Sequence, residues 1–313
     1  MAIREKVFSP MLAWSNPWEM QDLVAEGHFP LFGSYKIDGI RAIHRGGRLV
    51  SRTLKPIPSA WAQKYFATGD LECGGFDGEL VSTRVPPGNT LFSQSYSDVM
   101  THGAMEPLQW LIFDIADPEL KSAPYYERLA ALQEFVGPEY SDIGVRVLEQ
   151  RRLDTVEEVL AMESEALDQG HEGLIVRRMG SPYKWGRSTF KEGALIKLVR
   201  VLTSEAVVEG FEERMHNANI ATVDARGYTK RSSVQENLSG LGVLGAFRVR
   251  DIVSGAKFKI GTGDGWDDAF RLEVWKNQAR YLGRIQKYKF KPCGSKDLPR
   301  HPVGLGWRSP DDL

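Results

Sequence analysis

The chain has 313 residues, about twice the usual size of one domain, so we expect two compact domains. Its hydrophobic fraction of 42% and charged fraction of 26% are typical of folded globular proteins and argue against extensive disorder. It has no apolar run near the roughly 18 residues that cross a bilayer, and its N-terminus lacks the apolar core of a signal peptide. We therefore expect a cytoplasmic protein with no membrane partner. Only Cys73 and Cys293 are present, and their separation favours neither a disulfide framework nor a zinc site.

The formal net charge of −1 conceals an uneven distribution of charge. Residues 203–313 hold 18 Lys and Arg against 14 Asp and Glu, a net of +4, which leaves −5 for residues 1–202. The basic part contains a short segment rich in cations and aromatics, a pattern suited to phosphate contacts. Lysines that protect a solvated strand edge would give the same pattern, and charge alone leaves both interpretations open. The residues concerned are Arg284, Lys287, Tyr288, Lys289, Phe290, Lys291, Lys296 and Arg300.

The first two thirds of the chain alternates short apolar runs with amphipathic stretches, which predicts mixed α/β structure. One helix is expected to begin near Ser122, and another is expected to be capped by Asp154 and ended by Gly170. Strands are predicted within 33–45, 48–54, 75–83, 109–117, 172–178 and 194–202, and helices within 56–67, 122–137 and 154–170.

Beyond Thr203 the segments become β-rich and are separated by Gly-rich or polar turns. About five strands with a single helix in about 110 residues are compatible with an OB-type barrel, a fold that often binds nucleic acid. The boundary is expected between Val201 and Ser204, which gives domains 1–202 and 203–313. The strands are predicted within 204–213, 244–251, 256–263 and 285–292, and the helix within 266–283.

A series of short motifs follows in order along the chain. The first, Lys36-Ile37-Asp38-Gly39-Ile40-Arg41, is weak evidence alone, because a surface lysine at a strand end is the commoner interpretation. Five more segments follow, at 51–55, 76–80, 111–117, 172–178 and 194–200, and a last one lies at 298–312. Together they resemble the motifs of the nucleotidyltransferase superfamily of ATP-dependent DNA ligases, RNA ligases and mRNA capping enzymes. The last motif resembles the DNA ligase form, and the resemblance is closest to the small bacteriophage-type enzymes.

The resemblance implies an α/β (α+β) nucleotidyltransferase domain with antiparallel sheets and flanking helices, followed by an OB-fold domain. It makes Lys36 the nucleophile that attacks the α-phosphate of ATP, forming lysyl-AMP and releasing pyrophosphate. An ordinary lysine, with a pKa of about 10.4, is neutral in roughly one molecule per thousand near pH 7.4, and only a neutral amine can attack. Nearby cations such as Lys197 and a bound Mg²⁺ (or Mn²⁺) would favour the neutral amine and neutralise phosphate charge. With Lys36, we expect Arg41 and Lys197 to be catalytic.

The resemblance also assigns roles to residues that would otherwise be interpreted as surface charges or core. Glu79 would hold the ribose or the metal and its water, and Glu172 would bind the metal through oxygen. Phe113 would stack on adenine, and Val176 would line the opposite face of the base. Lys197 would contact the α-phosphate.

Arginines are the expected phosphate ligands, since a guanidinium fork suits phosphate oxygens. Arg41 and Arg52 would hold the ribose-phosphate of AMP and the 5′-phosphate of a nick. By the resemblance, Arg300 and Arg308 would reach the β and γ phosphates when the second domain closes over ATP; simple contact with the DNA backbone is the alternative. Asp114 would brace the site.

Two positions depart from the family pattern. Val199 stands where many ligases carry a second lysine, two residues after Lys197, and Arg200 is the candidate to replace it. Ser34 stands two residues before the nucleophile, where some relatives place a glutamate that reads the adenine amino group. We expect Ser34 in the nucleotide site, without a visible base-reading residue.

The implied reaction is ATP-dependent nick sealing in duplex DNA, in replication, recombination or repair, by a monomer in a bacterial cell or a phage-infected host. Its three steps are adenylylation of Lys36, transfer of AMP to the 5′-phosphate, and attack by the 3′-hydroxyl. The steps need cations, metal and positioning more than a dedicated base. The alternatives are an RNA ligase, a GTP-using capping enzyme, and a non-catalytic OB-type protein that binds nucleic acid.

Residues 216–240 are long for a hairpin loop, and loops longer than about 12 to 15 residues are usually functional or disordered. We predict a DNA clasp that orders around a nick, with a disordered insertion as the alternative. Lys230 and Arg231 are the expected phosphate contacts of this clasp, and Lys287 and Lys289 are further expected DNA contacts.

Overall fold

The computed structural model describes the chain except for residues 1–7, 15–18, 68–70, 72–74, 88, 102–107, 292–297 and 310–313. Of the residues discussed above, Cys73, Cys293 and Lys296 lie outside the described part. The chain divides into two units. The first comprises Met1–Val199 with Val223–Tyr228, and the second comprises Arg200–Thr222 with Thr229–Leu313. The division at Arg200 falls slightly before the expected one, and the return of a short segment to the first unit was not expected.

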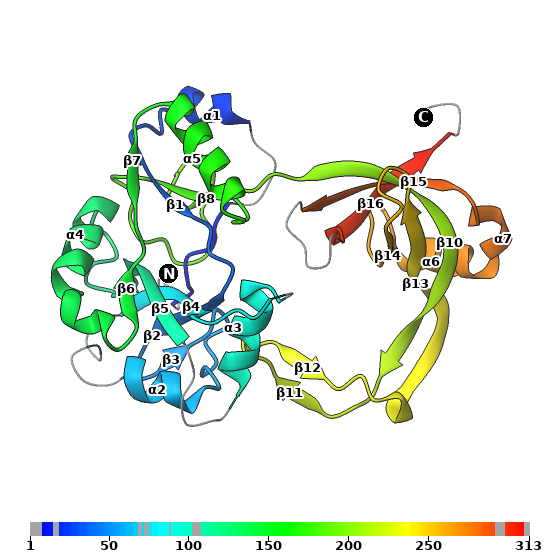
Figure 1. Cartoon of the computed structure of the whole chain (residues 1–313), viewed down its shortest axis with the longest axis horizontal. Helices are drawn as coiled ribbons and strands as arrows, with labels where there is room; N and C mark the ends of the chain where they lie inside the picture. Colours follow the sequence, from blue (N-terminus) through cyan, green and yellow to red (C-terminus); the bar gives the residue numbers. More distant parts are fainter. Residues whose placement is uncertain are drawn as a thin grey trace, which may run out of the picture. The chain divides into compact units, whose positions relative to one another are not determined.

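One sheet of the first unit has five strands in the order β3-β2-β4-β5-β6 (Figure 1). Its pairs are antiparallel except for the parallel pair β5–β6. Three helices contribute to its core, because Phe66, Val99 and Leu132 are buried in one cluster with Trp110 of β5. The elements are β2 (Ile40–His44), β3 (Leu49–Val50), α2 (Ala60–Phe66), β4 (Phe76–Ser82), α3 (Leu91–Met100), β5 (Leu108–Ile115), α4 (Tyr125–Phe135) and β6 (Val145–Val147).

The other sheet of the first unit has four antiparallel strands in the order β7-β1-β8-β9. Leu23 of α1 and Val159 and Met162 of α5 pack on it in a second core cluster. The elements are α1 (Met20–Ala25), β1 (Leu31–Tyr35), β7 (Arg151–Leu153), α5 (Val156–Asp168), β8 (Leu174–Arg178) and β9 (Ile196–Leu198). The expected mixed α/β unit with antiparallel sheets and flanking helices is therefore confirmed.

Two expected helix starts were wrong. Thr155, and not Asp154, caps α5, because its side chain accepts from the N–H of Glu158. The helix at 122–137 begins at Tyr125, since Pro124 precedes it with an extended backbone. Gly170 does follow α5 as expected, with a φ of 80° that favours glycine.

The second unit is built on a five-stranded antiparallel sheet in the order β14-β13-β10-β15-β16. Phe247 and Tyr288 from its strands pack with Val274 of α6 in its core. An isolated bridge between Gly263 and Gly304 links the segment after β14 to β16, so the two edges of the sheet approach each other. The elements are β10 (Leu202–Asn217), β13 (Leu238–Asp251), β14 (Lys257–Ile260), α6 (Asp268–Lys276), α7 (Gln278–Tyr281), β15 (Ile285–Lys291) and β16 (Arg300–Arg308). Within the described residues, no helix has both the length and the apolar character needed to cross a membrane.

The segment 216–240 is an ordered arm and not a long structureless loop. Strands β10 and β13 stay paired out to Asn217 and Leu238. Between them, β11 (Ala221–Val223) and β12 (Thr229–Arg231) form a two-stranded sheet, and a short 3-10 turn (Gln235–Asn237) follows. The segment is therefore not one long hairpin loop, because strand pairing continues into it from both sides and also occurs within it.

The tip of this arm, residues 223–228, packs within the first unit. Asp224 holds its turn by accepting hydrogen bonds from the N–H groups of Arg226 and Tyr228. Ala225 has no exposed surface and belongs to the core cluster of Trp110. The hydroxyl of Thr53 donates to the carbonyl of Gly227 at 2.9 Å. The tip is thus a docked element of the first unit.

Candidate functional site

A cavity of about 340 Å³ lies in the first unit and is lined by strands of both sheets. Cationic side chains and one carboxylate share its wall with apolar groups. Seven of the predicted site residues line it: Ser34, Lys36, Arg41, Arg52, Glu79, Phe113 and Lys197. Ile175, the neighbour of the predicted Val176, lines it in place of Val176. The remaining lining residues are Leu12, Ala13, Ile37, Leu148, Arg177, Arg187 and Leu195.

Strand register explains why residues from distant motifs meet here. Across β1, β8 and β9, Ser34 lies opposite Ile175 and Ile175 lies opposite Lys197. Across β2 and β4, Arg41 lies opposite Glu79. Side chains directly opposite in an antiparallel pair share one face of the sheet. Each sheet therefore presents a row of side chains to the cavity, and all of them except Ile175 are polar.

Phe113 enters the cavity at an irregularity in its strand. In the β4–β5 pair, Asp77 lies opposite Asp114 and Gly78 lies opposite Ile112, so Phe113 is the extra residue of a bulge. A bulge re-aims the side chain that it contains. Phe113, which as an apolar residue in an apolar strand would by default join the core, thereby lines the cavity instead.

Val176 does not line the cavity, which corrects the expectation that it lies against the base. Val176 has no exposed surface and packs in the cluster of Leu31, Leu153 and Met162, on the face of β8 away from the cavity. Ile175 is the residue of this motif that lines the cavity. The alternation of a strand over 172–178 could have separated the two faces.

Lys36 follows β1, and its Nζ lies 2.7 Å from Oε2 of Glu172. Glu172 is 4% exposed and Lys36 is 24% exposed, so the ion pair is sheltered but within reach of solvent. The main-chain N–H of Lys36 donates to the carbonyl of Gly173 at 2.8 Å, which ties the two motifs together. At Gly173, with a φ of 136°, a Cβ would lie 2.2 Å from the carbonyl oxygen of Leu198, so only glycine fits.

Glu79 has Lys36 and Arg41 in its electrostatic surroundings, and its carboxyl is nonetheless harder to ionise than an ordinary glutamate. Burial raises the pKa of Glu79 to about 7, although Lys36 and Arg41 act to lower it. Desolvation therefore outweighs the attraction of both neighbours. At neutral pH this carboxyl is close to the midpoint of its titration.

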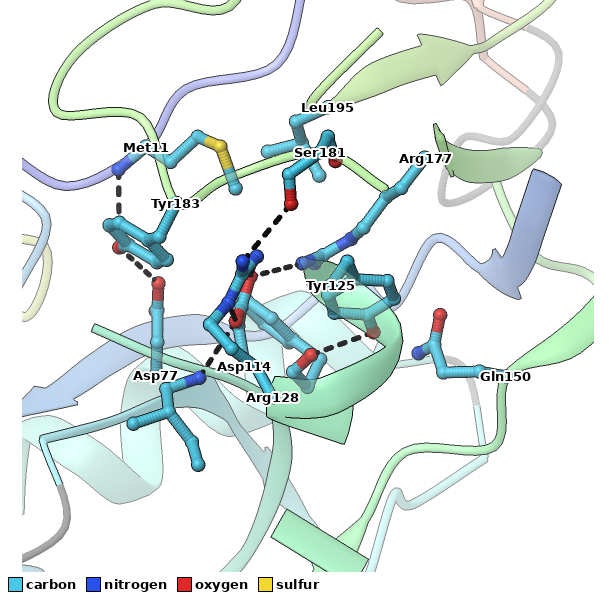
Figure 2. A network of polar contacts seen from close by, with 12 residues as sticks. Met11, Asp77, Asp114, Tyr125, Arg128, Gln150, Arg177, Ser181, Tyr183 and Leu195 are labelled. Atoms are coloured by element: carbon cyan, nitrogen blue, oxygen red, sulfur yellow. Dashed lines mark hydrogen bonds and ion pairs between the residues drawn. The ribbon is translucent and has the colours of Figure 1, made fainter. Parts of the chain in front are cut away.

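Arg41 is held rigidly. Its Nε and one terminal nitrogen donate to the two oxygens of Asp77 at 2.8 and 2.5 Å, and its other terminal nitrogen donates to the carbonyl of Met11 at 2.8 Å. Burial opposes the charge, but the carboxylate of Asp77 raises the pKa of Arg41. The hydroxyl of Tyr183 also donates to Asp77, at 2.7 Å (Figure 2). A bidentate pair of this kind fixes both the charge and the plane of the guanidinium.

Asp114 braces a second group of arginines, as Figure 2 shows. One of its oxygens lies 2.7 Å from Nε of Arg128, and the other lies 2.5 Å from a terminal nitrogen of Arg177. Asp114 and Arg128 are almost without exposed surface. The guanidinium carbon of Arg177 lies 5.2 Å from the ring centre of Phe113. This network supports the wall that carries Phe113.

Arg187 and Arg177 are cavity residues that the motif analysis did not identify. Arg187 donates to the carbonyl of Ala13 at 2.7 Å and lies near Arg52. Burial and then the charges of Arg41, Arg226 and Arg187 lower the pKa of Arg52. No sequence spacing pointed to Arg187, because it comes from the loop between β8 and β9.

The remaining predicted residues lie in the second unit. Arg300 and Arg308 are the ends of β16, and Nε of Arg308 lies 3.2 Å from Oε1 of Glu205. Lys287 and Lys289 lie on β15, which is paired on both sides, so they do not protect a strand edge. All four residues therefore belong to the five-stranded sheet of the second unit.

The arm residues differ from each other. Lys230 is exposed on β12. Arg231 donates to the main-chain carbonyl of Asn219, so at least one of its donors holds the arm together.

The comparisons with known proteins all point to one protein family. The ATP dependent DNA ligase domain matches residues 10–198, and the DNA ligase OB-like domain matches residues 241–308. The second match confirms the expected OB fold. The first match contains every predicted site residue of the first unit from Ser34 to Lys197.

Curated relatives are named probable DNA ligases. The one from Kineococcus radiotolerans is 30% identical over 213 residues, which are 65% of this chain and 40% of the relative. The one from Rhodococcus opacus is 29% identical over 271 residues, which are 83% of this chain and 48% of the relative. The chain thus spans about half or less of the length of these relatives.

Two solved structures are similar over almost the whole chain. The Chlorella virus DNA ligase-adenylate is 26% identical with a TM-score of 0.53, over 97% of this chain and 99% of that one. A structure of the Lig E DNA ligases has a TM-score of 0.66 at 22% identity, over 97% of this chain and 100% of that one, and supports the fold.

The titration of Glu79 predicts a pH-dependent stability. Because the folded state raises the pKa of Glu79 from 4.5 to about 7, its contribution to stability is complete below pH 4.5 and is lost as the pH rises through 7. Glu79→Gln removes this titration. Between about pH 5 and about pH 8, the wild type should lose about 2 to 3 kcal/mol of unfolding free energy relative to Glu79→Gln. Urea unfolding of the ligand-free protein measures this difference.

Glu119→Gln, at an exposed glutamate of the same unit, is the control for this experiment. A pH-independent difference between wild type and Glu79→Gln would show that Glu79 ionises as freely in the folded as in the unfolded chain.

Proposed function

This chain belongs to the family of ATP-dependent DNA ligases, and from that premise we propose that it seals nicks in duplex DNA through a covalent lysyl-AMP intermediate. The observation that carries the proposal is the convergence of separate motifs on one cavity beside Lys36. In the first step Nζ attacks the α-phosphorus of ATP, a P–N bond forms, and the bond to pyrophosphate breaks. AMP then passes to the 5′-phosphate of a nick, and the 3′-hydroxyl displaces it.

The contact between Lys36 and Glu172 sets the condition for the first step. Nζ of Lys36 lies 2.7 Å from a carboxylate oxygen of Glu172 and has to leave this ion pair before it can attack phosphorus. Positive charge in the cavity favours the approach of the triphosphate to Nζ. Arg41 and Lys197, which line the same cavity, supply such charge and neutralise the phosphate.

The donor set fits the magnesium that the family implies. Mg²⁺ prefers one or two carboxylates and completes its shell with phosphate oxygens and water. Glu172 and Glu79 would hold it, since both lie in the electrostatic surroundings of Lys36. Among the described residues no group of three or more Asp, Glu, His or Cys could hold a metal, so phosphates would supply the remaining ligands. When bound, Mg²⁺ (or Mn²⁺) would neutralise phosphate charge.

The cavity also has surfaces suited to a nucleotide. Phe113 and Ile175 come from the two different sheets, and we propose that adenine lies between them. Lys197 and Ser34 flank Ile175 in register, which favours contacts of Lys197 with the α-phosphate and of Ser34 with the nucleotide.

The arginines beside the cavity suit the 5′-phosphate of a nick. Arg52 has the cations Arg41, Arg187 and Arg226 in its surroundings, and these lower its pKa after the larger effect of burial. Phosphate oxygens would relieve this crowding of like charges. We propose that Arg52 contacts the nick and that Arg41 orients the ribose-phosphate of AMP.

The second domain is proposed to contact ATP in the first step and DNA in the later steps. Arg300 and Arg308 are proposed to contact the β and γ phosphates during self-adenylylation. Lys287 and Lys289 are proposed to contact the DNA backbone, together with Lys230 on the arm. The match of residues 241–308 to the DNA ligase OB-like domain favours DNA ligation over RNA ligation or capping. We propose that the enzyme acts on nicked duplex DNA as a monomer.

The arm is proposed to close around the nick. Its support is the docked tip, in which Ala225 is buried and the carbonyl of Gly227 accepts from Thr53. The guanidinium of Arg52 lies 5.4 Å from the ring centre of Tyr228, so the docked tip also touches a proposed DNA ligand. An arm whose tip is docked in this way would keep a bound duplex from leaving the enzyme sideways.

Lys36→Ala should abolish covalent labelling by ATP that carries ³²P at the α-phosphate, because a methyl group cannot replace the amine. We expect a loss of at least about 10³-fold, and Lys191→Ala, at an exposed lysine of the same unit, should label normally. Denaturing electrophoresis reads the label, and labelled GTP tests the capping alternative. Labelled Lys36→Ala protein would remove Lys36 from the role of nucleophile.

Arg308→Ala should lose self-adenylylation but still seal nicks whose 5′ ends already carry AMP, since Arg308 is proposed to act on the leaving pyrophosphate. The matched control is Glu205→Gln, which breaks the 3.2 Å ion pair of Arg308 and keeps the guanidinium. This control should self-adenylylate. Equal losses of Arg308→Ala in both assays would place Arg308 on DNA instead.

Gly227→Ala should weaken binding of nicked DNA by roughly tenfold and leave self-adenylylation unchanged. At Gly227, with a φ of 77°, a Cβ would lie 2.0 Å from Oγ1 of Thr53 and 2.3 Å from Oγ of Ser51, so both hydroxyls would have to move and docking of the tip would weaken. Gly242→Ala is the control, because Gly242 has a φ of 66° but open space around it and suffers backbone strain alone. Equal nick affinities in the two variants, measured by gel shift, would reject the docked clasp.

A further inference from the structure

The docked tip of the arm brings a further arginine to the cationic wall of the cavity. Arg226 belongs to this tip, which packs within the first unit. After burial, the charges of Arg41 and Arg226 lower the pKa of Arg52 the most. Arg187, which lines the cavity, has a smaller effect on Arg52. The charge of Arg226 therefore belongs to the same group of cations, although this residue comes from the arm.

Hydrogen bonds and one aromatic ring hold Arg226 beside Arg52. Thr53, the residue after Arg52, donates from its hydroxyl to the carbonyls of Arg226 and Gly227 at 3.3 and 2.9 Å. The guanidinium carbons of Arg52 and Arg226 lie 5.4 and 5.6 Å from the ring centre of Tyr228. The two guanidinium groups thus share one ring, and the main chain at Arg226 is tied to the residue next to Arg52.

The guanidinium of Arg226 is oriented by its neighbours and stays accessible. Its Nε and one terminal nitrogen donate to Oδ2 of Asp224 at 3.3 and 3.1 Å. Its guanidinium carbon lies 5.7 Å from the ring centre of Phe92, in the first turn of α3. The side chain nevertheless remains 49% exposed. Asp224 takes two of the five N–H donors of a guanidinium, so the exposed part of Arg226 can still donate to a phosphate.

The carboxylates near these arginines offset only part of their charge. Asp77 pairs with Arg41, and Asp224 pairs with Arg226. Glu79, the carboxyl that acts on Arg52, is only partly ionised near neutral pH because burial raises its pKa to about 7. A phosphate would relieve the remaining repulsion between like charges. A terminal phosphate carries about two negative charges near pH 7 and a phosphodiester carries one, so this group of cations favours a terminal phosphate.

We propose that Arg226 binds the 5′-phosphate of the nick together with Arg52, so that the docked tip completes the site for this phosphate; the inference rests on the proposed function. An undocked arm leaves the phosphate with one arginine fewer. Docking of the tip and binding of the 5′-phosphate therefore favour each other, because each raises the affinity for the other. Arg226 is thus a residue that distinguishes a phosphorylated nick from one that ends in a 5′-hydroxyl.

The test compares two nicked duplexes that differ only in carrying a 5′-phosphate or a 5′-hydroxyl. A 3′-dideoxy end and the absence of divalent metal prevent sealing, and gel shifts measure binding to the full-length protein. The wild type should prefer the phosphorylated nick. Arg226→Met should lower this preference about tenfold, or about 1.4 kcal/mol, and should change the affinity for the 5′-hydroxyl nick little. The salt dependence of binding to the phosphorylated nick should flatten by about 0.9 for the lost phosphate contact.

Lys230→Met is the matched control, because Lys230 is an exposed cation of the same arm that is proposed to contact the DNA backbone. This variant should weaken binding of both nicks equally and keep the preference. Self-adenylylation, which needs no DNA, reports whether each variant is folded. Arg226→Lys, which keeps the charge without the planar fork, replaces Arg226→Met if the latter does not fold. Because Arg52 and Arg226 would bind one phosphate, the double variant with Arg52→Met should lose less than the two single losses added together.

Three results would overturn the proposal: equal affinity of the wild type for the two nicks, an unchanged preference in the Arg226 variant, or an equal loss for both nicks in that variant. The last result would place Arg226 on the DNA backbone or in the support of the tip. Failure of the wild type to bind either nicked duplex would instead reject the proposed function.

Discussion

Two buried aspartates on neighbouring strands determine where the arginines of the cavity wall lie. Asp77 and Asp114 lie opposite each other across β4 and β5, and neither has exposed surface. Two desolvated carboxylates this close require cations, and each one holds arginine at hydrogen-bond distance. The cationic wall of the cavity follows from this constraint, since Arg41 and Arg177 reach the cavity while they remain bound to the aspartates.

A rigid wall of this kind contrasts with the groups around Lys36, the proposed nucleophile. Arg41 is fixed by three hydrogen bonds, whereas Lys36 is held by one carboxylate and is partly exposed. Glu79, with a pKa raised to about 7 by burial, can change its charge near neutral pH. Fixed cations pre-organise a site for phosphate charge, and adjustable groups respond when that charge arrives. This division suits a sequence of displacements at phosphorus.

The docked arm tip extends the same first unit with residues that lie far away in the sequence. Tyr228 packs against Arg52, and Thr53 holds the backbone at Gly227. The motif at 51–55 is therefore shared between the cavity and the tip. A change in the tip can therefore affect Arg52, a proposed DNA ligand, directly within the first unit.

Motif order in the sequence was enough to indicate the family, to propose a nucleophile, and to predict most of the polar cavity lining, because these residue types are required by phosphoryl chemistry wherever they lie. Periodicity predicted most of the longer strands and helices, but α1, α3, β6, β7, β11, β12 and β16 were not predicted. Most of these elements are short, whereas α3 is an amphipathic helix of ten residues that the pattern could have revealed. The cap of α5, the choice of Ile175 over Val176, the entry of Phe113 at a bulge, and the docking of Ala225 were decided by the tertiary structure. Each depends on register between strands or on burial by distant segments, and a linear pattern does not contain those contacts.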